Sequence, residues 1–507
     1  MIPQVLAITT VARDGKVSIR KAVKQHLGSD ALYVGVQDEV RLVGKPSATA
    51  QAVMLRGTRI TLPSSVLETL DLSPGALLAF VSRPDSAVAL KRMTVEEHPG
   101  DFPHVTDVET PHALVRIAYT NPMPDVLLPQ LQARHADIHL HYDVRSFLQG
   151  RESLPVWQAR KLLDCADAGD DALRERLIEA RLSAQADDGS WDGNVLLTAR
   201  NLRELAALGL TRDDAPIQRA VAWLVARPQS KHNPGQWFAA DDLVEEQAQV
   251  VASRQAGKGG RFRKILTSEK KRVISGDDLI QKPCGPRIMW PNGLVIEALL
   301  KLGYEGHERV QTALRTLTTN EWCECGYQHG LSDWKRTEPL TEDELPDFEQ
   351  ACIAQYRYGG FRDLKWLTGP DAPSRVAHTV KPDGDVYDLT VPDHVQGCEF
   401  ITTRSLSGVQ HPVARRFAEA HLWRFAGLQR AGGTFPEESY GSGFSQIGIL
   451  EAVARYDHPA SQVVLMRALP WIVETQNIDG SWGEGARKDV ETLAAVRAIS
   501  SMPVSVL

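Results

Sequence analysis

The chain has 507 residues, of which 43% are apolar and 24% charged, and its formal net charge is −7. This composition supports a large core and excludes a polycation built along its whole length for nucleic acid. No run of about 18 apolar residues is present, so no membrane-spanning helix is predicted. Six cysteines are too few for a disulfide scaffold. Because Met1 to Arg20 also lacks a signal-peptide core, we expect a cytoplasmic protein.

Residues 1–98 contain two copies of one short unit, which is a strand, a helix and a β-hairpin. The first copy is predicted at 11–43 and the second at 53–90. In the second copy Pro63 opens the helix, a position that suits proline because the first helical turn leaves its N–H groups unpaired. The duplication predicts a small β-domain at this end of the chain.

The two matching segments, Gly15–Lys21 and Thr58–Ser64, make this region resemble the AbrB/MazE-type swapped-hairpin domain. In that family two chains interlock into a small β-barrel that binds DNA. The resemblance implies that the two copies form such a barrel within one chain, although Arg20 stands where the family pattern has proline. The basic residues in and around these segments are the candidate DNA-binding residues, and a docking or packing role is the alternative: Arg13, Lys16, Arg20, Lys21, Arg56 and Arg59.

Residues 99–153 are punctuated by six prolines and are predicted to be a connector. The stretch also carries His135, His139 and His141. Three histidines at this spacing either lie on the surface or, if the segment is helical, ligate a metal ion.

From residue 154 to 507 the apolar spacing is helical, and three glutamine-led motifs separate the helical stretches. They run from Gln185 to Trp191, from Gln429 to Phe435 and from Gln476 to Trp482, and the last two begin 476 − 429 = 47 residues apart. A related sequence, Gly235-Gln-Trp237, is a stretched version. A recurring helix–turn–helix unit predicts a repeat architecture.

These motifs resemble the QW motifs of terpene cyclases and the related prenyltransferases. The resemblance implies an (α/α)6 toroid over 154–507, so the fold class is mainly α with a small N-terminal β-barrel. It also implies structural roles: the glutamine amide satisfies backbone groups at the next helix, glycine makes the tight turn, and the aromatic ring packs between helices. The residues concerned are Gln185, Gly189, Trp191, Gln429, Phe435, Gln476, Gly480 and Trp482.

Two stretches interrupt the helical pattern. The first, at about 241–283, is basic: the segment from Arg254 to Arg272 holds eight basic residues and one acidic residue. It is expected to bind diphosphate, nucleic acid or an acidic partner, or to be a solvated insertion. The second, at about 333–395, is acidic and rich in proline and is expected to be an exposed insertion.

The terpene cyclase resemblance directs attention to acids. A class II cyclase protonates an alkene and needs a strong carboxylic acid held in an Asp-x-Asp-Asp motif. This chain has no intact copy, and Tyr387 stands where an aspartate is wanted. The nearest candidates for a catalytic acid, or otherwise for a solvated loop, are Asp383, Asp385 and Asp388.

The prenyltransferase resemblance implies a zinc ion that turns a substrate thiol into a thiolate. The Cys-x-Cys pair at Cys323 and Cys325 is the best metal-like cluster, and cysteine buried as a small apolar residue is the alternative. Further candidate ligands are Cys284, His329, His394 and Cys398.

Three functions are compatible with these patterns. The first is an enzyme or binding protein for an isoprenoid-like apolar ligand in the toroid. The second is a DNA-binding regulator whose toroid senses a ligand or a metal. The third is an inactive toroid that serves as a scaffold.

Overall fold

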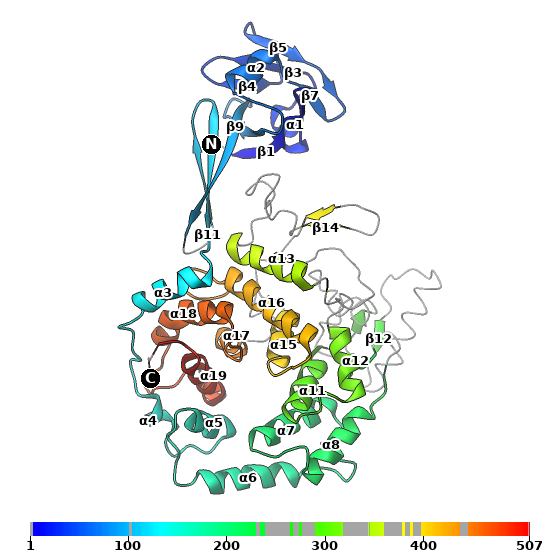
Figure 1. The fold of residues 1–507 in the computed structure, drawn as a ribbon, viewed down its shortest axis with the longest axis vertical. Coiled ribbons are helices and arrows are strands. Elements are labelled where there is room, and N and C mark those ends of the chain that lie inside the picture. Colours follow the sequence, from blue (N-terminus) through cyan, green and yellow to red (C-terminus); the bar gives the residue numbers. More distant parts are fainter. Residues whose placement is uncertain are drawn as a thin grey trace. The chain divides into compact units, whose positions relative to one another are not determined.

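The computed structural model contains two compact units, and its described residues are divided between them at Asn121 and Pro122 (Figure 1). The described residues are 4–100, 104–229, 234–238, 264–266, 273–275, 289–317, 343, 345–358, 378–380, 386–388, 397–436, 445–504 and 506.

The first unit is a sheet domain with two short helices. Its elements are β1 (Val5–Thr10), β2 (Lys16–Ser18), α1 (Lys21–Leu27), β3 (Leu32–Val36), β4 (Val40–Val43), β5 (Ala50–Val53), β6 (Leu55–Arg56), β7 (Arg59–Thr61), α2 (Ser64–Thr69), β8 (Leu77–Ser82), β9 (Val88–Pro99), β10 (His104–Glu109) and β11 (Ala113–Thr120).

The predicted helices and hairpins of the two copies are confirmed, because α1, α2 and the pairs β3–β4 and β8–β9 lie where the pattern placed them. The predicted strands are shorter than expected. The segment 11–19 has its predicted glycine turn, at Gly15 before β2, whereas 53–62, predicted as one strand, turns at Gly57 between β6 and β7; both glycines have positive φ. Glycine reaches this conformation without steric cost, so the chain reverses there.

The strand pairings of this region join the two copies to each other and to the segments beside them. Strand β1 pairs with β8, β5 with β3, β4 with β9 and β2 with β7. The main sheet, in the order β1-β8-β9-β4-β3-β5, is antiparallel over these strands and curls into half a barrel (Figure 1). Buried residues from both copies share one core, including Val17, Val23, Ile60 and Val66. Strands of the first copy therefore pair with strands of the second, and the two copies share one core.

The stretch expected to be a connector contains regular structure in both units. Strand β9 continues to Pro99, where it pairs in parallel with β11, and β11 pairs with β10. The buried Lys91 side chain holds this hairpin, because its Nζ donates to the carbonyls of Thr110 and Pro111 and to Glu39 Oε2. The remainder contains α3 (Pro124–Arg134) and α4 (Val144–Leu148) of the second unit.

The second unit is helical. After α3 and α4 come α5 (Leu154–Leu162), α6 (Asp170–Leu182), α7 (Val195–Ala207), α8 (Ala215–Val225), α11 (Met289–Lys301), α12 (Glu308–Leu317), α13 (Leu345–Tyr358), α15 (Gly397–Ser405), α16 (Pro412–Leu428), α17 (Gln446–Val453), α18 (Pro459–Glu474) and α19 (Lys488–Ser500), with a 3-10 turn at Gly485–Arg487. Two short strand pairs are also described: β12 (Lys264–Leu266) with β13 (Val273–Ser275), and β14 (His378–Val380) with β15 (Val386–Asp388).

Six of the described helices pack in a series that we call the central series: α5, α19, α17, α15, α11 and α7. Helix α6 contacts both α5 and α7 and so joins the two ends of the series (Figure 1). Further helices pack on members of the series: α8 on α7, α12 on α11, α16 on α15 and α18 on α17. One large apolar core runs through these helices. In the described part of the chain, no helix combines the length and apolarity that crossing a membrane requires.

Candidate functional site

Four turns in the described residues fix the N-terminal ends of helices of the central series. In each, the backbone N–H of the aromatic residue donates to a side chain in the first two turns of the following helix. Trp191 donates to Thr198, Trp237 to Asn292, Phe435 to Gln446 and Trp482 to Thr492, over 2.8 to 3.0 Å. The stretched turn at Trp237 is therefore a true member of the set.

The tryptophans of these turns also bind the helix that precedes them. The indole Nε1 of Trp191 donates to Arg181 O, that of Trp482 to Ile472 O, and that of Trp237 to Leu224 O. All three carbonyls lie in the last turn of a helix, where carbonyls have no partner within the helix. The ring of Phe435 has no N–H, so this second bond is absent from the third turn.

The glutamine of each predicted motif donates twice through its amide. Gln185 Nε2 binds Gly189 O and Pro216 O, both at 2.9 Å. Gln429 Nε2 binds Gly433 O and Val464 O, both at 2.8 Å. One acceptor lies in the same turn and the other in a helix outside the central series, α8 or α18. The groups that these glutamine amides satisfy are backbone carbonyls.

The last turn binds the beginning of the helical unit. Gln476 Nε2 donates to Tyr142 O at 2.8 Å, and Tyr142 N–H donates to Gln476 Oε1 at 2.9 Å. A Cβ at Gly480 would lie 2.5 Å from Asp143 O, so only glycine allows this approach. Together with the packing of α19 on α5, this contact joins the end of the unit to its start.

At the opposite ends of the central helices lies a set of charged side chains that sequence patterns did not single out. We call it the helix-end charge cluster: Arg203 of α7, Glu297 and Lys301 of α11, Arg404 of α15, Glu451 of α17, Arg455 just beyond α17, and Arg497 of α19.

Two buried carboxylates organise the helix-end charge cluster. Glu297, 3% exposed, pairs with Arg455 at 2.8 Å, Arg203 at 3.1 Å and Lys301 at 3.2 Å, and it lies 3.8 Å from Arg404. Glu451 accepts from Arg455 Nη2 at 2.7 Å and from Arg497 Nη1. The C-terminal ends of the helices must therefore lie together, since these side chains are too short to meet otherwise.

The protonation states follow from this crowding. Burial alone would raise the pKa of Glu451, but the charges of Arg455, Arg404 and Arg497 outweigh burial and lower the pKa to about 2. The pKa of Glu297 is likewise held well below its usual range against the effect of burial. For Lys301 burial lowers the pKa, and the neighbouring Arg455 and Arg203 lower it further against the opposing effect of Glu297. Both carboxylates are thus ionised at neutral pH.

The candidate DNA-binding residues lie on the sheet domain. Neighbouring segments carry Lys16, Arg20, Arg56 and Arg59. Val17 and Ile60 face the core, so Lys16, Arg56 and Arg59 lie on the outer face of the sheet β2-β7-β6. Arg56 and Arg59 are directly opposite each other. Arg20 follows Ile19, whose N–H donates to Thr58 O at 2.7 Å. Lys21 begins α1, and Arg13 is exposed in the turn before β2.

The predicted catalytic and metal-binding residues lie outside the part of the chain that the structure describes in atomic detail. Asp388 ends β15 and Cys398 is in α15, and only their backbone is described. Outside the described residues altogether are Asp383, Asp385, Cys284, Cys323, Cys325, His329 and His394. Among the described residues no group of three or more His, Cys, Asp or Glu side chains is arranged to hold a metal ion. Both sites stay predictions.

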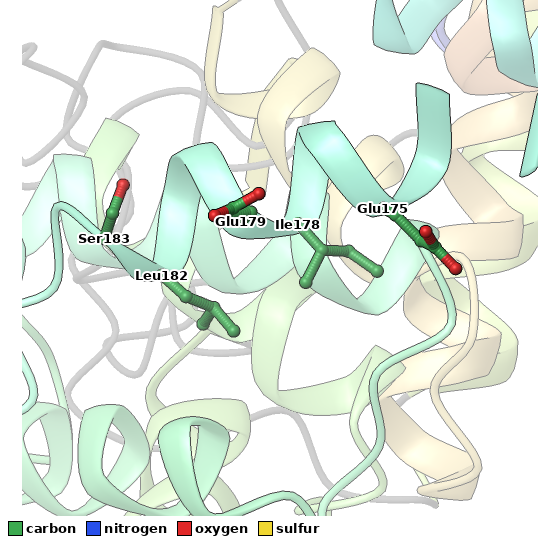
Figure 2. Close-up of a pocket in the computed structure, with 5 residues that line it drawn as sticks. All are labelled: Glu175, Ile178, Glu179, Leu182 and Ser183. Carbon is green, nitrogen blue, oxygen red and sulfur yellow. The ribbon is translucent and has the colours of Figure 1, made fainter. Parts of the chain in front are cut away.

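The described part of the helical unit has open depressions, and the lining residues of two of them are defined. One, of about 540 Å³, lies along α6 and is lined by Glu175, Ile178, Glu179, Leu182 and Ser183 (Figure 2). These positions share one helical face, which combines an apolar floor with two carboxylates. The other, of about 280 Å³, lies beside the last turn and includes Trp471, Trp482 and Glu491. Neither brings together an acid and a base at hydrogen-bond distance in the described residues.

No protein-family model and no curated protein matches the chain. Solved structures of two variants of the type II terpene cyclase MstE from Scytonema, both in complex with geranylgeranyl dihydroxybenzoate, are similar to it. The first has 14% sequence identity and a TM-score of 0.24, and it covers 68% of this chain and 97% of the solved chain. The second has 13% identity and a TM-score of 0.23, with coverages of 68% and 96%. Similarity at this level does not assign the chain to a family.

Proposed function

We propose that residues 154–507 form an (α/α)6 toroid of the terpene cyclase and prenyltransferase type that binds or converts an isoprenoid-like apolar ligand. The contact between Gln476 and Tyr142 carries the proposal, because it closes the helical unit on itself through the same turn that joins neighbouring helices elsewhere. The central series supplies the inner helices, and α6, α8, α12, α16 and α18 supply the outer ones. A closed double layer of helices is an architecture that encloses an apolar ligand between its inner faces.

If the ligand is converted, the acid that starts the reaction is drawn from Asp383, Asp385 and Asp388. Protonating an alkene requires a carboxylic acid whose neighbours stabilise its loss of a proton. Clustered carboxyls with differing environments divide such roles. Asp385 is assigned the proton-donating role because Asp383 and Asp388 flank it in sequence.

The experiment uses the full chain and geranylgeraniol, a neutral isoprenoid alcohol. Saturable binding, followed through the quenching of tryptophan fluorescence, is expected, with much weaker binding of a straight-chain alcohol of equal carbon number. Conversion is followed by mass spectrometry of extracted products. Asp385→Asn should abolish any turnover, while Asp137→Asn, at an exposed position in the same unit, should not change it. Absence of both binding and turnover would overturn the proposal in favour of an inactive scaffold.

A second function is favoured by the placement of cations on the sheet domain. Arg56 and Arg59 face each other across a two-stranded hairpin, where like charges destabilise the pair. Arg20 and Lys21 occupy the start of α1, where the helix dipole disfavours positive charge, and that first turn has no acidic residue. A phosphate backbone relieves both kinds of repulsion. We infer that this face of the sheet domain binds DNA, with the helical unit as a ligand-sensing part.

Gel-shift titrations of the full chain with duplex DNA at two salt concentrations test this function. Binding should weaken steeply with salt, and Arg56→Ala/Arg59→Ala should reduce the slope of log affinity against log salt by about 1 to 2 units. The control is Arg92→Ala, an exposed arginine of the same domain that pairs with Asp71. Absence of binding by the unaltered chain at the lower salt concentration would exclude DNA as the partner.

A further inference from the structure

The helix-end charge cluster contains more positive charge than its carboxylates balance. Among the described residues, five cations (Arg203, Lys301, Arg404, Arg455 and Arg497) share two anions, so the formal excess is 5 − 2 = 3. None of these residues has another carboxylate within ion-pair distance in the described structure. The excess is a property of this end of the central series.

Two other buried arginines in the same unit are each balanced by one carboxylate. Arg160, with a side chain 4% exposed, pairs with Asp170, and Arg424, fully buried, pairs with Glu399. In each case one carboxylate meets one guanidinium, as is expected when a buried ion pair serves only to hold helices together. The helix-end charge cluster departs from this pattern, so packing alone does not explain its composition.

The helix ends themselves account for part of the excess. The C-terminus of a helix carries a partial negative charge of about 0.5, and cations in the last turn are favoured there. Lys301, Arg404 and Arg497 are in the last turns of α11, α15 and α19. Helix α7 ends at Ala207, and Arg203 lies before its last turn. The dipole of α7 therefore stabilises the charge of Arg203 less. The helix dipoles therefore account for Lys301, Arg404 and Arg497 at the helix ends, but not for Arg203.

Accessibility separates the cations from the carboxylates. Glu297 and Glu451 are 3% and 8% exposed, whereas Arg203, Arg404, Arg497 and Lys301 are 20%, 28%, 26% and 41% exposed. The carboxylates thus lie beneath a more accessible layer of positive charge. The Arg404 Nε–H is buried beneath that layer, 3.8 Å from Glu297 Oε2, and has no hydrogen-bond partner among the described residues. Partly exposed guanidinium and ammonium groups above buried carboxylates are suited to receive an anion from solvent.

We propose that the helix-end charge cluster binds the oxygens of a phosphate or diphosphate group. Arg203, Lys301, Arg404 and Arg497 come from four helices, and the half-buried Arg455 pairs with both carboxylates, so an anion over them is contacted from several sides. Guanidinium groups match phosphate oxygens with two parallel hydrogen bonds, and the lysine adds a point charge. Glu297 and Glu451 hold the cations together against their mutual repulsion. This site is independent of whether the helical unit binds an apolar ligand.

Isothermal titration of the full chain with inorganic pyrophosphate, inorganic phosphate and acetate tests the proposal. Pyrophosphate should bind saturably and more tightly than phosphate, because it offers more oxygens to the same cations. Arg203→Gln and Lys301→Gln should each weaken pyrophosphate binding by about tenfold, the loss expected for one charge-assisted hydrogen bond. Arg200→Gln is the matched control, since Arg200 lies on α7 three residues before Arg203, is 63% exposed and pairs with Glu204.

Circular dichroism and melting temperature establish that each variant is folded, and Lys301, the most exposed member, is the position most tolerant of change. No saturable binding of pyrophosphate by the unaltered chain would overturn the proposal. So would equal binding by Arg203→Gln, Lys301→Gln and the unaltered chain, which would place the anion elsewhere. Acetate binding as tight as that of pyrophosphate would overturn the phosphate assignment. None of these outcomes depends on geranylgeraniol binding, which tests the proposed function separately.

Discussion

Gln476 and Tyr142 exchange two hydrogen bonds across 334 positions of the chain, the amide donating to a carbonyl and accepting from an N–H. Gln185 and Gln429 bind helices that follow them, whereas Gln476 binds the segment that precedes α4. The same type of turn thus binds a following helix in two copies and the segment before α4 in the third. The last copy of the motif thereby joins the C-terminal helices to the start of the helical unit.

Loss of this contact should destabilise the helical unit. Gln476→Ala removes both hydrogen bonds and leaves Tyr142 O and the Tyr142 N–H without them, at an expected cost of about 1 to 3 kcal/mol in the free energy of unfolding. Denaturant unfolding followed by tryptophan fluorescence measures this, since every tryptophan of the chain follows residue 156. Gln130→Ala, at an exposed position in α3, is the control and should change little. An equally small effect of Gln476→Ala would mean that apolar packing of α19 on α5 suffices for closure.

The two carboxylates of the helix-end charge cluster should make the helical unit sensitive to acid. The pKa of Glu451 is lowered from 4.5 to about 2, so the ionised form stabilises the folded state by on the order of 3 kcal/mol. This stabilisation is complete above the unfolded pKa near 4.5 and is lost as the pH falls toward 2.

Glu451→Gln tests that pH dependence. At pH 7 it should cost about 3 to 5 kcal/mol, because Arg455 and Arg497 lose their carboxylate in a buried place. The difference between variant and unaltered chain should shrink on acidification from pH 5 to about pH 2, over the range in which Glu451 gains a proton. Glu419→Gln, which removes a surface pair with Arg415, should change the free energy of unfolding by about 0.5 kcal/mol or less at either pH. A pH-independent cost for Glu451→Gln would contradict the assigned pKa.

Lys91 should control the β10–β11 hairpin of the sheet domain. Its side chain is 1% exposed and its Nζ donates to two carbonyls next to that hairpin as well as to Glu39. Lys91→Met keeps much of the apolar stem and removes all three bonds. Amide hydrogen exchange over 104–120 should become markedly faster, with a smaller change in β3 and β4. Lys45→Met, at an exposed position in the same domain, should leave the exchange rates unchanged. Faster exchange throughout the domain would show global rather than local loss of stability.

The cysteine pair outside the described residues predicts a metal ion. Elemental analysis of the purified chain by mass spectrometry is expected to find about one zinc ion per chain, the number that one tetrahedral site requires. Cys323→Ser/Cys325→Ser should lose it, whereas Cys165→Ser, which replaces a free cysteine of the helical unit, should retain it. Metal-free unaltered chain would contradict the zinc prediction.

Local sequence patterns predicted the parts of both units with some accuracy. Helices α1 and α2 and the hairpins β3–β4 and β8–β9 lie where alternation and turn residues placed them. The turns at Trp191 and Trp482 were recognisable because glutamine, glycine and tryptophan each satisfy a local requirement of that turn. The hairpin β10–β11 was not predicted, because the prolines around it are typical of an irregular connector.

The helix-end charge cluster was not foreseen. Its members are single charged residues near the ends of apolar helical stretches, a placement that usually indicates a solvated surface. A weak signal was present in the glutamates of α11 and α17, each of which interrupts an otherwise apolar face. Nothing in the spacing of Glu297 and Arg455, 158 positions apart, indicates that they meet.

The sequence by itself determined the local structure of this protein: the repeated helix and hairpin of the sheet domain, the helical stretches and the turns between them. These depend on backbone conformation and on hydrogen bonds over short separations, which side-chain types a few residues apart specify. Only the tertiary structure decided that Gln476 meets Tyr142 and that five helices bring their charges together at one end. Such contacts result from the packing of the whole core. The free energy that favours them comes from the burial of many apolar side chains, so no single sequence motif predicts them.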